Sequence, residues 1–202
     1  LADETESRKD QNLSDDNSMR ENAAQIIGQE TPEILMYNLW NQPPEEQKRR
    51  LDAALKKFPD DAYLLRLYAI YLDEQNNLDE AEKYYRYAIK VAPQNSVNLE
   101  NYALFLETKR RKYDLAERYY KRAIKSDPEN ARILGNYALF LEIQKKNYDD
   151  AEKYYLLAIK AGPSNAGNLG NYAVFLDSQR HDYKGAEEYY RRAISADPKD
   201  TR

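Results

Sequence analysis

Apolar side chains recur at intervals of three and four residues over much of the chain, which is the spacing of one face of an α-helix. Two such stretches fill residues 131–165: Leu134, Tyr137, Ala138 and Leu141, followed by Ala151, Tyr155, Ala158 and Ile159. Polar residues 145–147 separate them, and Pro163 closes the second stretch, because proline cannot continue a helix. The pattern predicts two helices joined by a short turn.

This helical pair is repeated along the chain at a fixed interval. Four prolines that close the units stand 35 residues apart: Pro93, Pro128, Pro163 and Pro198. Residues 96–130, 131–165 and 166–200 are identical in 14 of 35 aligned columns, and residues 62–95 form a fourth unit whose turn is one residue shorter. A helical hairpin cannot bury both faces by itself, so the units are expected to stack into one array.

The residues before the array divide into two parts. Residues 1–17 are polar and charged, which predicts a mobile tail. Residues 18–60 predict an N-terminal helix at 19–27, opened by a capping box that starts at Ser18, and then a degenerate first repeat at 31–60. The short helix is expected either to cap the array or to contact a partner.

The chain stops soon after Pro198, without the polar capping helix that helical arrays usually carry. We therefore expect the array to continue in a longer protein. In the sequence given, the last helix would expose side chains that a following repeat covers in the other units: Tyr189, Tyr190, Ala193 and Ile194. This end is expected to cause weak homo-association.

Composition excludes several classes of function. Cysteine is absent and His181 is the only histidine, which argues against thiolate or histidine metal sites, disulfides and Ser-His-Asp catalysis. The net charge of −4 argues against a nucleic-acid partner, and the basic cluster at residues 109–112 is interpreted as a solvated turn. No apolar run could span a membrane. We expect a soluble protein without cofactor or enzymatic activity, with the cytoplasm as the default compartment.

The repeated residues closely resemble the tetratricopeptide repeat family. The resemblance rests on these positions of one unit: Leu134, Asn136, Tyr137, Ala138, Leu141, Tyr148, Ala151, Tyr155, Ala158 and Pro163. The family's common glycine in the first helix is replaced by Ala69, Ala103, Ala138 and Ala173. The related half-a-TPR repeats of RNA-processing factors match less well, because a leucine separates Phe140 from Glu142. The resemblance implies an all-α fold, a right-handed superhelical array of antiparallel helix pairs, or α-solenoid.

The resemblance also implies that first helices line a concave groove that binds protein. Three rows of side chains would then share this groove, and the first is an asparagine row, expected to be exposed and to hold the backbone of a peptide: Asn101, Asn136 and Asn171. The second is an apolar row: Ile70, Leu104, Leu139 and Val174. The third is an acidic row: Asp73, Glu107, Glu142 and Asp177. A bonding role for the asparagines between neighbouring helices is an equal alternative.

The family's clamp for acidic chaperone tails is matched only at Arg66, Asn101 and Arg132, and Ile70 and Asn136 depart from it. The predicted function is therefore a non-catalytic protein-interaction module or scaffold, whose groove holds an extended segment that carries basic and apolar side chains. Two alternatives stay open: a structural spacer or self-association element, and the recognition arm of a larger enzyme.

Overall fold

The computed structural model describes residues 31–32 and 36–197. Within these residues every regular element is helical: η1 (Leu39–Asn41), α3 (Pro44–Lys57), α4 (Ala62–Glu74), α5 (Leu78–Val91), α6 (Ser96–Thr108), α7 (Tyr113–Ser126), α8 (Ala131–Phe140), η2 (Leu141–Lys145), α9 (Tyr148–Ala161), α10 (Ala166–Phe175), η3 (Leu176–Arg180) and α11 (Tyr183–Ala196). The predicted tail at 1–17 and the predicted helix at 19–27 lie outside the described residues.

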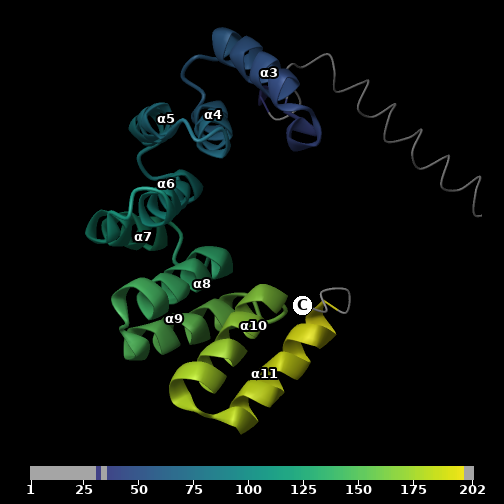
Figure 1. Ribbon diagram of the computed structural model, residues 1–202, viewed down its shortest axis with the longest axis vertical. Helices are drawn as coiled ribbons and strands as arrows, with labels where there is room; N and C mark the ends of the chain where they lie inside the picture. Colours follow the sequence, from purple (N-terminus) through teal and green to yellow (C-terminus); the bar gives the residue numbers. More distant parts are fainter. Residues whose placement is uncertain (1–30, 33–35, 198–202) are drawn as a thin grey trace, which may run out of the picture.

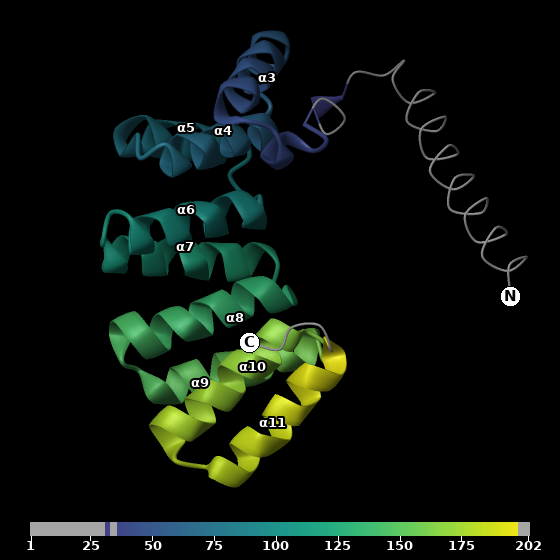
Figure 2. The ribbon, with the colours of Figure 1, turned by 45° about the vertical axis from the view of Figure 1, so that its right-hand side comes forward.

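Consecutive helices pair into antiparallel hairpins, namely α4 with α5, α6 with α7, α8 with α9, and α10 with α11. Figure 2 shows these hairpins stacked one on another between α3 and α11. In Figure 1 the array curves, and α4, α6 and α8 lie nearer its inner side than α5 and α7. The prediction of an all-α repeat solenoid is confirmed.

Each first helix begins at a residue whose side chain caps it. Asp61, Asn95, Asn130 and Asn165 each accept a hydrogen bond from the backbone N–H three residues further on. These caps satisfy amides that have no partner within the helix, and the preceding Pro93, Pro128 and Pro163 stop the helix before. The breaker and the cap together fix the boundary between units.

The extra residue of the longer units is absorbed where the first helix ends. In the short unit the Asn77 N–H donates to the Leu72 carbonyl, whereas in the third unit the Asn147 N–H reaches Leu141, one residue further back. In the third and fourth units the last turn accordingly widens into the π-helical segments η2 and η3. Each turn then passes through one residue in the left-handed region: Asn76, Arg111, Lys146 or His181.

The core alternates alanine with aromatic rings. Ala103, Ala138 and Ala173 are fully buried, so the helices approach closely there. Tyr137 lies between two units, with ring centroids 5.7 Å from Tyr120 and 4.7 Å from Tyr154. Because each unit supplies one ring to the next, this aromatic stack continues across every hairpin interface.

The N-terminal part differs from a full repeat. In the degenerate first repeat predicted at 31–60, Pro32 is helical, but residues 36–38 form a turn and Leu39–Asn41 a short 3-10 helix. Residues 33–35 lie outside the described part. The later part of this repeat forms α3, where buried Leu51 and Ala54 pack toward α4. Pro43 and Pro44 start α3, since proline fits the first turn of a helix.

Candidate functional site

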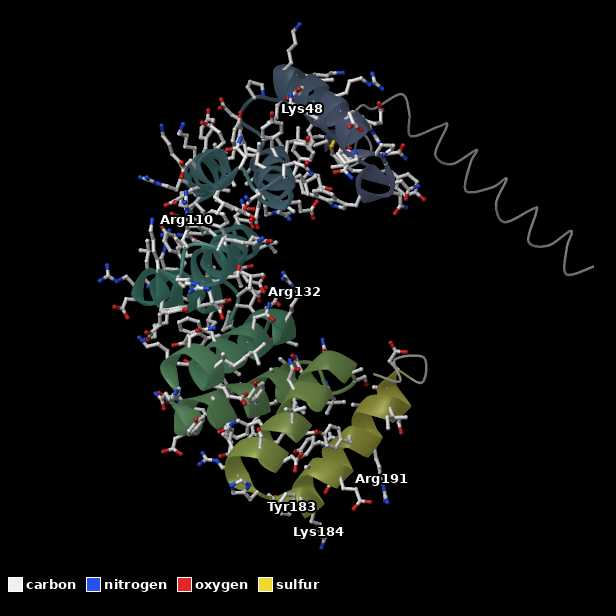
Figure 3. The ribbon with its side chains drawn as sticks, viewed as in Figure 1. Lys48, Arg110, Arg132, Tyr183, Lys184 and Arg191 are labelled. Atoms are coloured by element: carbon white, nitrogen blue, oxygen red, sulfur yellow. The ribbon has the colours of Figure 1, made fainter. Side chains whose placement is uncertain are left out.

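The candidate site lies on the first helices, on the inner side of the curve. Figure 3 shows the Arg132 side chain on that side of α8. Asn136 and Leu139 follow Arg132 by four and seven residues, so they occupy the same helical face. Residues at the same repeat positions lie on the corresponding faces of α4, α6 and α10.

The asparagine row is half-buried, and the expectation of exposed side chains is wrong. Asn136 Nδ2 donates to Glu100 Oε1 of the neighbouring helix α6 at 2.8 Å, and Asn101 Nδ2 donates to the Val97 carbonyl at 2.7 Å. Neighbouring first helices stand close enough to cover these amides. The amide oxygens of Asn101 and Asn136 accept no hydrogen bond from the described residues, so both keep an acceptor.

The apolar row is uneven in exposure. Leu104 is 42% exposed and Val174 is 50% exposed, whereas Ile70 and Leu139 are half-buried. Ile143, one helical turn beyond Leu139, is 54% exposed. These side chains leave apolar surface uncovered on first helices whose opposite faces are fully packed.

The acidic row is partly engaged within its own hairpins. Glu107 accepts a hydrogen bond from the Tyr120 hydroxyl at 2.8 Å, and Glu142 accepts one from the Tyr155 hydroxyl at 2.7 Å. Burial raises the pKa of Glu107 above its ordinary value. Asp73 pairs with Lys109 at 3.2 Å, which leaves Asp177 as the exposed member. The row is therefore less available to a ligand than its sequence pattern suggests.

A buried polar cluster connects three first helices, and the sequence analysis missed it. Glu100 is only 1% exposed, and its carboxylate meets Arg132 Nη1 at 2.5 Å besides Asn136. Arg66 of α4 is attracted electrostatically by the same carboxylate, and burial lowers the pKa of its guanidinium. Burial likewise raises the pKa of Glu100. The sequence does hold one signal of this cluster: Glu100 stands at the repeat position that glycine, Gly135, occupies in the third unit.

Cations of the inter-helix turns are paired with the preceding hairpin. Arg110 bonds Asp79 at 2.5 Å and Glu82 at 2.8 Å, and Lys145 and Arg180 repeat this arrangement in the next two units. In the basic cluster at 109–112, Lys109, Arg110 and Lys112 all contact carboxylates of the first hairpin. The cluster therefore joins repeats rather than standing free in solvent.

A shallow hollow of about 690 Å³ lies beside α11, apart from the three rows. Its walls include Pro163, Leu169, Lys184, Glu188 and Ser195.

Within the described part of the chain, no cluster of carboxylates or histidine suits a metal ion. No helix among those residues has the length and apolar character needed to cross a bilayer.

Comparison with solved structures shows the same fold at low identity. PilF of Pseudomonas aeruginosa matches with a TM-score of 0.71 and 23% identity, over 81% of this chain and 73% of that one. MamA of Desulfovibrio magneticus RS-1 matches with a TM-score of 0.65 and 17% identity, over 84% and 94%. YrrB, a TPR protein described with an unusual peptide-binding site, gives 0.58 and 17%, over 82% and 83%.

A search of curated protein sequences finds no match. Models of the tetratricopeptide repeat match residues 48–96 and 107–166, and a second model of the same repeat matches residues 168–200. These spans cover most of the four hairpins and part of α3. The chain belongs to the tetratricopeptide repeat family.

Proposed function

We propose that the chain is a non-catalytic interaction module that binds an extended protein segment along its first helices. The observation that carries the proposal is the uncovered apolar surface of Leu104, Val174 and Ile143 on the helices of the inner side. Most other large apolar side chains of these helices, such as Leu99, Phe105 and Phe140, are buried between repeats. Burying such side chains against a ligand removes apolar area from water, which favours binding.

Polar groups beside this surface suit a peptide backbone. The side-chain amide oxygens of Asn101 and Asn136 can each accept a backbone N–H, because only their nitrogens are engaged. Asn171 makes no hydrogen bond to the described residues and can both donate and accept. Contacts to the backbone would hold a segment without selecting its side chains.

Charge favours a ligand with basic side chains, mainly at the C-terminal end of the array. Asp177 is exposed there, while Glu107 and Glu142 already accept hydrogen bonds from tyrosines. Exposed ion pairs contribute about 0–1 kcal/mol each. The acidic row should therefore affect the association rate and its salt dependence more than the final affinity.

The similarity to YrrB supports a peptide ligand in general, since that protein is described with a peptide-binding site on the same fold.

The test is selection from a phage library of random peptides with the full chain as bait. Selected peptides are expected to be rich in apolar and basic residues. Leu104→Arg should weaken their binding at least about tenfold, since it places a charge on the apolar row. Leu156→Arg is the matched control, because Leu156 is 44% exposed on α9, a second helix, against 42% for Leu104. Both variants should keep the helical content of the parent.

Two outcomes would reject the segment-binding proposal. The first is equal loss of binding in both variants, and the second is failure of the library to yield any binder. Either result would favour the structural spacer.

A further inference from the structure

The outer face of α11 exposes side chains whose counterparts in the interior second helices are buried or, at Ile124, half-buried. Tyr85, Tyr120 and Tyr155 are at most 3% exposed, whereas Tyr190 at the same repeat position is 37% exposed. Ile89 and Ile159 are 8% and 7% exposed, against 57% for their counterpart Ile194. Tyr183 adds a further exposed ring at the start of the helix. The described residues leave this face uncovered.

The charges on this face suit another repeat of the same kind less well than those of the interior second helices. Interior second helices carry Asp79, Asp114 or Asp149, and each pairs with a cation from the turn of the following unit. At the same position α11 carries Lys184. A turn cation like those of the interior units would meet Lys184 in place of one of its two carboxylates, and only Glu187, at the position of Glu82, Glu117 and Glu152, would remain to pair with it.

The charges do suit a second copy of α11 in antiparallel orientation. Glu187 and Arg191 pair with each other within α11 at 2.6 Å, and both stay largely exposed. Glu187 lies in the N-terminal half of the helix and Arg191 in the C-terminal half, so reversal brings two such pairs together with unlike charges opposite each other. Tyr183 and Ile194 lie equally far along the helix from a midpoint between Glu188 and Tyr189. In the antiparallel pair, Tyr183 of one copy would therefore cover Ile194 of the other copy. Lys184 would reach the last turn of the facing helix, whose free carbonyls favour a cation.

We propose that the chain forms a twofold symmetric dimer through the α11 face that contains Tyr183, Glu187, Tyr190 and Ile194. The same patch on both copies contacts itself, as a twofold interface requires. Figure 3 shows Tyr183, Lys184 and Arg191 along this helix, at the lower end of the array. This face belongs to a second helix and is separate from the proposed segment-binding surface, so either proposal can fail without the other.

Sedimentation velocity of the full chain at rising concentration tests the dimer. The parent should shift from monomer toward dimer by several hundred micromolar. Ile194→Lys should weaken the association at least about tenfold, because it buries a charge in the apolar part of the contact. Leu157→Lys, which changes a side chain 38% exposed on α9, is the matched control and should dimerise like the parent.

Charge reversal tests the antiparallel orientation. Glu187→Arg alone and Arg191→Glu alone should each remain monomeric, since each sets like charges opposite one another. An equimolar mixture of the two variants should form a heterodimer, and the double variant should regain the dimer of the parent. A strictly monomeric parent would overturn the proposal, as would single variants that dimerise like the parent. Growth into higher oligomers would show head-to-tail stacking instead.

Discussion

The Tyr155 hydroxyl donates a hydrogen bond to the Glu142 carboxylate, with Oη and Oε2 2.7 Å apart. Tyr155 belongs to the second helix of its hairpin and is fully buried, while Glu142 lies in the widened end of the first helix. Tyr120 and Glu107 form the same bond one unit earlier, at 2.8 Å. A carboxylate of the acidic row thus satisfies a phenol that has no access to water.

This bond predicts unequal costs for removing its two partners. Glu142→Ala leaves the buried Tyr155 hydroxyl without an acceptor and should lower the free energy of unfolding by about 1–3 kcal/mol. Tyr155→Phe leaves only a half-buried carboxylate that water can reach, and should cost about 0.5–1.5 kcal/mol. Urea unfolding followed by circular dichroism measures both. Asp177→Ala is the control at the same repeat position, where the acid is exposed, and should leave stability unchanged. Equal costs in all three variants would contradict the bond's role.

Gly135 and Gly170 occupy the same position in neighbouring units, and alanine should have opposite effects there. A Cβ at Gly135 would lie 2.0 Å from Oδ1 of Asn168, which is 6% exposed and donates to the Ala131 carbonyl. Gly135→Ala should therefore destabilise the protein by about 1–3 kcal/mol, since Asn168 must move and lose this bond. At Gly170 nothing lies within 4 Å, so Gly170→Ala should stabilise its helix by about 0.5–1 kcal/mol. Thermal unfolding of the two variants gives the signs, and the same sign for both would refute the argument.

Local patterns were sufficient to predict the repeated hairpins. Pro163 and its counterparts stop the second helices by chemistry that neighbours do not alter, and alanine and tyrosine at helical spacing identify the packed faces. The fold therefore follows from residues that act within one unit or on the adjacent one. The repetition is weakest at the start of the chain's degenerate first repeat, where Pro32 is helical but residues 36–38 form a turn.

The candidate site was harder to predict, because its side chains depend on partners in other units. Asn136 is half-buried since Glu100, 36 positions earlier, stands beside it, and no periodic rule pairs a unique glutamate with a repeated asparagine. Glu107 and Glu142 appear as a surface charge row until the second helix brings a tyrosine to each. Spacing within one helix predicts a shared face, but it does not show which groups on that face already have partners.

Glu100 should make stability fall as the pH rises. Burial raises its pKa in the folded chain above the ordinary 4.5, although Arg132 and Asn136 of α8 and Arg66 of α4 favour the charged form. The folded state then holds a proton that the unfolded state has released, so stability decreases from about pH 4.5 up through the raised pKa. Glu100→Gln removes this titration. The variant's stability relative to the parent should therefore rise with pH across that window.

Urea unfolding at several pH values measures that difference. Glu46→Gln is a control of opposite sign, because Arg49 lowers the pKa of Glu46 and its contribution is lost as the pH falls below 4.5. If the free energy of unfolding changes with pH in the same way in the Glu100 variant and the parent, the pKa of Glu100 does not differ between the folded and unfolded chain, and the prediction is wrong.

Arg180 should stabilise the contact between the last two hairpins. It bonds Asp149 at 2.7 Å and Glu152 at 2.9 Å across the interface and lies over the Phe175 ring, so one planar group joins two units. Because Arg180 is about one-third exposed, Arg180→Ala should cost only about 0.5–1 kcal/mol, and less at high salt. Lys83 offers a matched comparison, since it pairs with Glu80 inside α5 alone at 2.5 Å. Lys83→Ala should leave the unfolding midpoint unchanged, whereas Arg180→Ala should lower it and broaden the transition as the final hairpin loosens from the array. A midpoint shift that is equal in the two variants, or one that salt does not reduce, would show that the inter-repeat ion pair adds nothing beyond an ordinary surface pair.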